Sequence, residues 1–360
     1  MNKNQKLHNA KRNKKDEFYT QLTDIEKELK HYKSQFEDKI IFCNCDDPEY
    51  SNFWKYFEMN FEFLGLKKLV STHYDVDNSS YKLELEKLRK HNGDIILKTT
   101  RTNLIENGDF RSKECIEILK ECDIVVTNPP FSLFREYVSQ LMEYNKKFII
   151  IGHQNAITYK EIFSLIKDDK IWLGASIHSG DREFRVPDDY ILTTSSFRTG
   201  ENGERYVRVN GVRWFTNIDY QKRHENLILY KPYNKKDYPK YVNYDAINID
   251  KTKDIPVDYE GVMGVPITFM DKYNPEQFEI VALGITGSCD FINSYKMEIL
   301  DKNGQSTGKF TYNAKGTLYK KYDPCYDKKP AFKNTETGEL YSSIYARILI
   351  KKRDLGGYYE

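Results

Sequence analysis

Four consecutive residues, Asn128, Pro129, Pro130 and Phe131, have the chemical types and the order needed to hold a planar amine. Each proline fixes φ, lacks an N–H donor and favours extended backbone at the residue before it, so Asn128 is held in a narrow backbone geometry. The side-chain oxygen of Asn128 and the carbonyl of Pro129 can accept the two N–H bonds of the amine, while Phe131 stacks on its ring. The tetrapeptide therefore suits chemistry at an exocyclic aromatic amine.

Such an amine is a poor nucleophile because its lone pair is delocalised into the ring. Two neutral acceptors let the nitrogen become tetrahedral as the transition state forms, without a strong base. The alternative is that Asn-Pro-Pro-Phe is only a turn that ends a strand, since Asn-Pro favours turns. Residues 124–126 have the composition of a buried strand, and the amphipathic segment 134–144 follows directly. This context of strand, turn and helix favours the functional interpretation.

Strands and helices alternate along the first two thirds of the chain, which predicts an α/β fold with a doubly wound, parallel sheet. A capping box at Thr23–Glu26 predicts a helix that runs to about Phe36. Further helices are predicted at 52–64 and 81–91, and another begins near Thr158. The predicted strands are 39–42, 67–71, 95–98, 124–126, 148–151, 171–173, 212–215 and 227–230.

The composition changes at two places and predicts three parts. Residues 1–15 form a basic N-terminal arm, residues 16–232 one large domain, and residues 233–360 a smaller and more irregular module. Within the large domain, residues 175–211 are rich in Gly, Asp and Ser, and they predict an inserted, mobile loop.

The net charge of the 360-residue chain is only +2, which gives no overall signal for a polyanionic partner. Two segments are locally basic. Residues 1–15 hold six Lys or Arg and no acid, and residues 296–353 hold thirteen Lys or Arg against six Asp or Glu. Either segment could neutralise phosphates, although the first could equally be a solvated terminus.

The sequence favours a protein of the cytoplasm without a bound metal. No stretch reaches the roughly 18 to 20 apolar residues of a membrane span, and the N-terminus lacks the apolar core of a signal peptide. Six cysteines in no regular framework fit reduced thiols. Cys43, Cys45, Cys115 and Cys122 could be imagined as zinc ligands, but their spacing matches no common zinc pattern and no paired histidine follows.

Two apolar residues and one further residue precede Asn128 to Phe131. Together these residues resemble the catalytic motif of amino-methyltransferases that use S-adenosyl-L-methionine on adenine N6. From residues 16–20 through residues 214–217, the order of motifs resembles the EcoRI-type adenine-specific DNA methyltransferases. The resemblance implies a Rossmann-like class I methyltransferase sheet and a C-terminal target-recognition module. Because the cofactor motifs precede Asn128, their order is similar to the gamma arrangement of these enzymes.

The resemblance also implies where the cofactor binds. Methyltransferases of this fold usually have a Gly-rich turn after the first strand, whereas this chain has Cys-Asn-Cys-Asp-Asp-Pro at 43–48. Asp46 or Asp47 could hold the ammonium group of the cofactor, or could cap the next helix. Asp75, rather than Asp77, follows the second strand where an acid would accept from the ribose hydroxyls.

Two further segments resemble cofactor motifs of the family. Asp109, with Phe110 beside it, lies where an acid would bind the adenine amine of the cofactor, although a plain Gly-Asp turn is the alternative. Phe18, Tyr19 and Thr20 resemble the N-terminal cofactor motif, but an apolar pair that docks the first helix would look the same.

The substrate would be double-stranded DNA with the target base flipped out between stacking side chains. Phe131 is one stacking residue and Phe215 the expected second, although a strand that bears Trp214 and Phe215 could simply belong to the core. A basic stretch with interleaved aromatics, either a DNA contact or a solvated surface, consists of Tyr319, Lys320, Lys321, Tyr322, Tyr326, Lys328, Lys329, Phe332 and Lys333.

The function expected from the motif is site-specific adenine N6 methylation, in restriction-modification or in DNA protection of a phage or host. Two rivals stay open. One is the same amine methylation on RNA or on a protein glutamine, which shares the Asn-Pro-Pro-aromatic motif. The other is a non-catalytic DNA-binding protein that keeps a methyltransferase fold, because the Gly-rich turn is missing. The sequence does not define the oligomeric state.

Overall fold

The computed structural model describes residues 19–45, 47–75, 80–90, 93–178, 180–186, 197–292, 295–312 and 316–353. The basic arm at 1–15, Phe18, Asp46 and Asp77 lie outside the described residues. The chain divides into two compact units, one of residues 1–162 with 170–221, the other of residues 163–169 with 222–360. The predicted functional division at residues 15 and 232 stays a prediction.

An eight-stranded sheet forms the first unit, with the strand order β5-β4-β3-β2-β6-β7-β12-β8. The pairs β2–β3, β2–β6 and β6–β7 are parallel, whereas β4 and β5 on one side and β12 and β8 on the other pair antiparallel. The α/β class is thus confirmed, but a sheet that is parallel throughout is wrong. The strands are β2 (Ile40–Cys43), β3 (Lys68–Thr72), β4 (Tyr81–Arg89), β5 (Ile95–Asn103), β6 (Ile124–Thr127), β7 (Lys147–His153), β8 (Trp172–Leu173) and β12 (Val212–Thr216).

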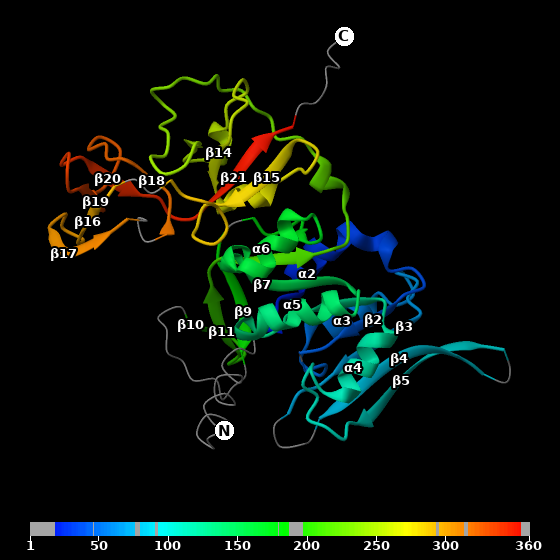
Figure 1. Ribbon diagram of the computed structural model, residues 1–360. Coiled ribbons are helices and arrows are strands. Elements are labelled where there is room, and N and C mark those ends of the chain that lie inside the picture. The colour runs from blue at the N-terminus through cyan, green and yellow to red at the C-terminus, as the bar shows by residue number, and fades with distance from the viewer. Residues whose placement is uncertain are drawn as a thin grey trace, which may run out of the picture. The chain divides into compact units, whose positions relative to one another are not determined.

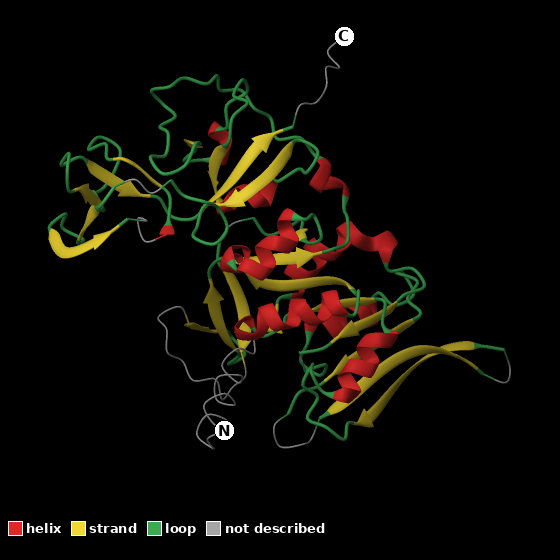
Figure 2. Cartoon of the chain, viewed as in Figure 1, coloured by secondary structure: helices red, strands yellow, loops and turns green. Residues whose placement is uncertain are grey.

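Helices cover both faces of the central strands (Figure 2). Successive side chains of a strand point to opposite faces. Ile41 and Cys43 of β2 belong to a buried cluster with Ile25 of α2 and Phe53 of α3, while α4 and α5 contact β2 and β7. The helices are α2 (Leu22–Leu29), α3 (Asn52–Met59), α4 (Lys113–Glu121), α5 (Phe134–Glu143) and α6 (Lys160–Lys167), with 3-10 turns η2 (Lys30–Gln35), η3 (Phe131–Leu133) and η4 (Gln154–Thr158).

The predicted helix at 81–91 is wrong over residues 81–89, which form strand β4 and pair antiparallel with β5 (Figure 1). Its Lys, Glu and Leu residues are good helix formers, but they also alternate with period two. Leu85 is 3% exposed in the core beside β3, whereas Leu88, beyond the end of β3, is 38% exposed. Pairing with β3 therefore overrides helix propensity.

Two smaller predictions also differ from the structure. Helix α2 begins at Leu22 after Gln21, which makes no side-chain cap, so Thr23 is not the N-cap, and the last turns form the 3-10 segment η2. Residues 227–230 form no strand, and Ile228 is 84% exposed. Its apolar side chain indicated a strand, but the segment has no partner strand.

The segment 175–211, predicted as a loop, contains β9 (Arg182–Val186), β10 (Phe197–Thr199) and β11 (Arg205–Val209). With β1 (Tyr19–Thr20) they form an antiparallel sheet of order β1-β9-β11-β10. Tyr19 pairs with Arg185, and Thr20 with Phe184. The loop prediction is therefore wrong over these strands, which hold β1 in place.

The second unit contains two small sheets, of order β13-β14-β21-β15 and β17-β16-β19-β20-β18. Each has its own buried cluster, around Leu349 in the first sheet and around Phe332 in the second. No helix in the described part of the chain is long and apolar enough to cross a membrane. The elements are β13 (Ile247–Asn248), β14 (Met263–Pro266), β15 (Phe278–Leu283), β16 (Met297–Leu300), β17 (Ser306–Thr311), β18 (Tyr319–Lys321), β19 (Phe332–Asn334), β20 (Leu340–Ser343), β21 (Arg347–Lys352), η6 (Thr252–Asp254) and η7 (Ile267–Lys272), with η5 (Gln221–His224) where the units meet in sequence.

Candidate active site

Asn128 lies at the carboxyl end of β6, between β2 and β7 in the middle of the sheet. Its side chain is 6% exposed, and Pro129 is also buried. Phe131 begins the 3-10 turn η3, which the backbone N–H of Leu133 closes by donating to the carbonyl of Pro130 at 2.9 Å. In an α/β sheet, ligands bind at the carboxyl ends of parallel strands.

Two hydrogen bonds join the end of β6 to the end of β2. The hydroxyl of Thr127 donates to the backbone carbonyl of Asn44, and the hydroxyl of Tyr137 donates to the side-chain oxygen of Asn44. Burial raises the pKa of Tyr137 well above its ordinary value, so its hydroxyl stays a donor at neutral pH. The turn after β2 is thereby fixed beside the Asn-Pro-Pro-Phe turn.

A pocket opens beside these turns. It contains four of the predicted site residues, Tyr19, Asp109, Phe110 and Pro130. Its further lining residues come from the ends of β2 and β3 and from the turns near Asp109 and Pro130. They are Cys45, Asp47, His73, Tyr74, Gly108 and Leu133.

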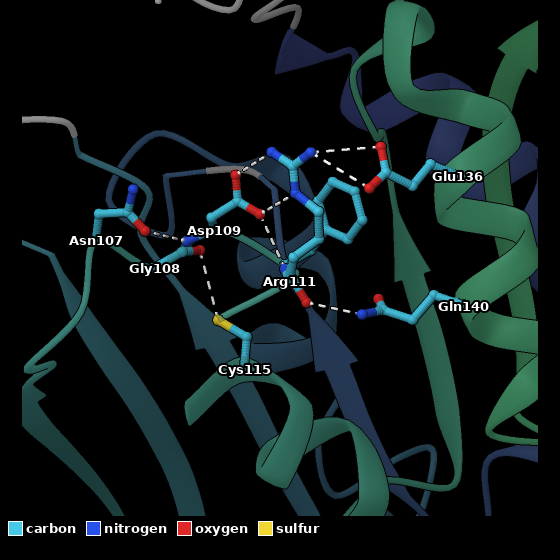
Figure 3. A network of polar contacts seen from close by, with 8 residues as sticks. Asn107, Gly108, Asp109, Arg111, Cys115, Glu136 and Gln140 are labelled. Atoms are coloured by element: carbon cyan, nitrogen blue, oxygen red, sulfur yellow. Dashed lines mark hydrogen bonds and ion pairs between the residues drawn. The ribbon is translucent and has the colours of Figure 1, made fainter. Parts of the chain in front are cut away.

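Arg111 holds the carboxylate of Asp109 with two side-chain hydrogen bonds, from Nε at 2.8 Å and from Nη2 at 2.7 Å (Figure 3). Its other terminal nitrogen, Nη1, lies 3.3 Å from the carboxylate of Glu136 on α5. Hydrogen bonding with Asp109 raises the pKa of Arg111, so the guanidinium remains charged. The carboxylate of Asp109 is therefore held in one orientation at the pocket.

Gly108 brings the backbone close to the end of β3. Its φ is +72°, and a Cβ at this position would overlap the carbonyl oxygen of His73. Only glycine combines this left-handed φ with so close an approach at little cost. Phe110, next along the chain, is 4% exposed and packs edge-on against Tyr137 with ring centroids 5.0 Å apart.

Asp47 connects the turn after β2 to the neighbouring strands. Its Oδ1 accepts from the hydroxyl of Tyr81 at 2.9 Å, and its Oδ2 lies 3.5 Å from Nε2 of His73. Burial and the bond to Asp47 raise the pKa of Tyr81, so the phenol remains a donor. A carboxylate and an imidazole thus lie side by side at the pocket.

Six of the described residues that the sequence predicted do not line the pocket, namely Asn128, Pro129 and Phe131 of the turn after β6, and Thr20, Asp75 and Phe215. Thr20 is 2% exposed on β1, and its carbonyl accepts from the side chain of Asn52 at 2.7 Å. The backbone N–H of Asp75 donates to the carbonyl of Asn107 at 3.0 Å, next to the pocket wall. Phe215 is fully buried, with its ring centroid 4.9 Å from that of Phe134, which favours the core role over base stacking.

His73 and Tyr74 follow β3 directly and line the pocket, but sequence reasoning passed over them in favour of Asp75. The sequence predicted that Asp46 or Asp47 would contact the cofactor, and Asp47 is the one that lies within the described residues. The signal for all three was their position just after predicted strands. Residue type alone pointed to the aspartates and not to His73 and Tyr74.

The basic stretch near residue 320 divides into buried and exposed parts. Lys320 is 6% exposed, and its ammonium lies 2.9 Å from the carboxylate of Asp327. Tyr319 and Phe332 belong to the buried cluster of that sheet. The exposed residues of the stretch are Lys321, Tyr326, Lys328, Lys329 and Lys333.

Within the described residues, no group of three or more His, Cys, Asp or Glu could hold a metal ion. The six cysteines, all of them described, form no disulfide. Burial raises the pKa of Cys115, and it raises the pKa of Cys122 to about 12, so both thiols are neutral at physiological pH.

Comparisons with known proteins agree with this geometry. Residues 6–353 match the family described as adenine-specific methyltransferase EcoRI. The chain is 50% identical over 309 residues to Type II methyltransferase M.EcoRI of Escherichia coli, with 80% of this chain and 94% of the relative covered. It is 43% identical to Type II methyltransferase M.MgeORF184P of Mycoplasma genitalium (76% and 84% covered) and 40% identical to Type II methyltransferase M.MpnI of Mycoplasma pneumoniae (76% and 83%).

Proposed function

We infer the reaction of this protein from its family. The chain belongs to the family described as adenine-specific methyltransferase EcoRI. The protein is an adenine-specific DNA methyltransferase of the type II class, which acts in restriction-modification. We propose further that it transfers a methyl group from S-adenosyl-L-methionine to N6 of adenine within a specific site of duplex DNA. The observation that carries this proposal is the Asn128-Pro129 turn at the end of β6, beside a pocket with an oriented aspartate.

The residues of the pocket fit S-adenosyl-L-methionine. Phe110 and Leu133 are apolar surfaces for a purine ring, and the Arg111-bound carboxylate of Asp109 can accept from its amine. Asp47 can accept from the hydroxyl or ammonium groups of the cofactor. Gly108 leaves room where a side chain would press against His73. When bound, this cofactor supplies an electrophilic methyl group on sulfur.

The catalytic contribution of the chain is to orient and polarise the target amine. The side-chain oxygen of Asn128 and the carbonyl of Pro129 accept hydrogen bonds from its two N–H groups, and Phe131 stacks on the base. Burial of Asn128 supports this role, since hydrogen bonds strengthen where water is excluded. Neutral acceptors favour the tetrahedral nitrogen of the transition state over the planar ground state.

The finer architecture follows from the same family. We propose that the mixed sheet is a class I methyltransferase sheet in the gamma order, and that the two small sheets of the second unit belong to a target-recognition module. The target adenine leaves the duplex to reach the turn, because its amine is not accessible within base pairs. Phe131 is half-buried at the turn, and we propose that it stacks on the flipped base. A DNA substrate also fits the predicted cytoplasmic location.

The test is transfer of a labelled methyl group to unmethylated genomic DNA, followed by digestion and chromatography of the nucleosides. Labelled N6-methyldeoxyadenosine is the expected product, and sequencing the modified sites would give the specificity. Label that appears only in RNA or in protein glutamine would overturn the DNA substrate. The protein would be a non-catalytic binding protein if it bound DNA but transferred no methyl group, and if calorimetry detected no heat of binding for S-adenosylhomocysteine.

A further inference from the structure

A second concave surface lies within the second unit, between the β16–β17 hairpin and the segment that leads into β19. We call it the lysine groove. Its rim is defined by the exposed lining residues Lys302, Lys309 and Lys329, and its apolar floor by the half-buried lining residues Pro330 and Ala331. Its volume is about 580 Å³. An apolar floor between cationic side chains suits a ligand that alternates apolar groups and anions.

Among the described residues, Asp301 is the acid that lines the groove beside its three lysines, so the groove keeps a surplus of positive charge. Elsewhere in this sheet Lys320 pairs with Asp327 at 2.9 Å, and Lys321 pairs with Glu339 at 2.8 Å. Among the described residues, the three lysines of the groove form no such ion pair. They therefore keep their charge available for an external anion.

Asp301 is the acidic residue of the groove, and its carboxylate is already engaged. Its Oδ1 accepts from the backbone N–H of Asn303 at 2.8 Å and of Gln305 at 2.9 Å. The hydrogen bond from Gln305, then that from Asn303, and also the charge of Lys329 hold the pKa of Asp301 below its ordinary value. The carboxylate thus closes the turn that carries Lys302, and the groove remains cationic.

Backbone bonds fix the spacing of the rim. The N–H of Leu300 donates to the carbonyl of Ala331 at 2.9 Å, which ties the end of β16 to the segment with Lys329. The hydroxyl of Thr307 donates to the carbonyl of Ile299 at 2.6 Å, which holds β17 beside β16. The three lysines therefore extend from a hydrogen-bonded framework and not from an unsupported loop.

We propose that the lysine groove binds the sugar-phosphate backbone of the duplex that flanks the methylated site. Phosphates contact the ammonium groups, and deoxyribose packs on Pro330 and Ala331. The proposal rests on the proposed function, which provides the DNA substrate. Contacts to phosphate position a protein on the duplex without reading its sequence. The groove would thus raise affinity for DNA with and without the target site.

The test compares the chain with the variant Lys302→Gln, Lys309→Gln and Lys329→Gln by fluorescence anisotropy with duplexes over a salt series. Each phosphate contact contributes roughly 0.9 to the slope of log affinity against log salt. We expect the slope to become less negative by about 2 to 3, and the affinity at low salt to fall by about ten- to hundred-fold. The loss should be equal for duplexes with and without the target, and kcat at saturating DNA should not change.

Two control variants make the result specific. Arginine at the same three positions keeps the charge and should keep both affinity and slope. Glutamine at Lys27, Lys30 and Lys55, exposed lysines of the first unit, makes the same change in net charge and should have little effect. Equal losses in this control and in the groove variant would overturn the proposal, and so would an unchanged salt slope in the groove variant.

The proposed function can fail separately. If the unaltered chain binds DNA with a steep salt slope but transfers no methyl group, the reaction fails and the groove stands. A different result would show that the proposal is wrong and that the groove binds an acidic protein. In that case the chain methylates DNA, and the groove variant binds duplex DNA as tightly as the unaltered chain but binds a polyglutamate peptide less tightly.

Discussion

The carboxylate of Glu28 accepts a hydrogen bond from the backbone N–H of Ser176 at 2.8 Å, although 148 residues separate the two. Its other oxygen accepts from the N–H of Ala175 and from the hydroxyl of Tyr32, both at 2.8 Å. Glu28 is fully buried on α2. It thereby joins this helix to the segment before β9, the strand that pairs with β1 and holds Tyr19 at the pocket.

Replacing Glu28 with Gln should destabilise the protein by about 1 to 3 kcal/mol, because an amide nitrogen then faces a buried N–H donor. Urea denaturation measures the loss. Glu58 is exposed on α3, and Glu58→Gln should change the free energy of unfolding by less than about 0.5 kcal/mol. Equal effects of the two variants would show that the bonds to residues 175 and 176 do not stabilise the fold.

Asn128→Ala should lower methyl transfer by at least about 10²-fold to 10³-fold, because it removes one of the two acceptors for the target amine. Binding of S-adenosylhomocysteine, measured by calorimetry, should stay within a few-fold of the unaltered chain. Gln35→Ala removes an exposed amide and is the matched control. Full activity of Asn128→Ala would refute the assignment of this residue.

Gly108→Ala should weaken cofactor binding and reduce stability by more than about 1 kcal/mol, because it combines a left-handed φ with overlap onto the carbonyl of His73. Gly93 has φ +90° with nothing within 4 Å of an added Cβ, so Gly93→Ala isolates the cost of φ alone. Thermal unfolding and calorimetry give the two readouts. Identical results for both variants would mean that the close approach at Gly108 does not matter.

Asp327→Asn should destabilise the protein at pH 7 by about 1 to 3 kcal/mol, since it leaves the buried Lys320 without its counter-charge. Burial opposes ionisation of Asp327, but hydrogen bonds from the N–H of Asp323 and from Lys320 outweigh it and lower its pKa. Because the pKa of Asp327 is lower in the folded protein than in the unfolded chain, its ionised form stabilises the fold. This stabilisation is complete above the unfolded pKa of about 3.9 and disappears as the pH falls through the folded pKa.

Urea denaturation from pH 7 to pH 3 measures this dependence. The free-energy gap between Asp327→Asn and the unaltered chain should narrow only below about pH 4. Asp245→Asn breaks an exposed pair with Lys240 and should leave the free energy of unfolding nearly unchanged at every pH. A gap that stays constant down to pH 3 would contradict the role of the Asp327 carboxylate.

The sequence predicted the central strands better than the edges of the sheet. Residues 124–126 and 148–151 are continuous apolar runs, and they form β6 and β7 in the buried parallel core. Residues 81–89 were read as a helix because Leu, Glu and Lys favour helices locally. Pairing with β3 on one side and with β5 on the other makes them a strand.

The candidate site divides in the same way. Asn128 could be located because two prolines fix its backbone and a strand ends directly before it. The roles of Asp47, His73 and Tyr74 depend on how three different turns come together, and spacing along the chain does not encode this. The sequence could not decide between a core role and a stacking role for Phe215, because a buried aromatic and a stacking aromatic look identical in sequence.

The bond between Thr127 and Asn44 joins positions 83 residues apart, whereas β3, β4 and β5 follow one another along the chain. Closing a long loop costs more chain entropy than closing a hairpin, so contacts that are local in sequence form faster. We therefore expect the β3–β4–β5 meander to fold early and the β2–β6 junction to fold late. The turn that carries Asn128 should then be completed only after most of the sheet, so we expect a nascent or partly folded chain to lack the proposed methyl-transfer site.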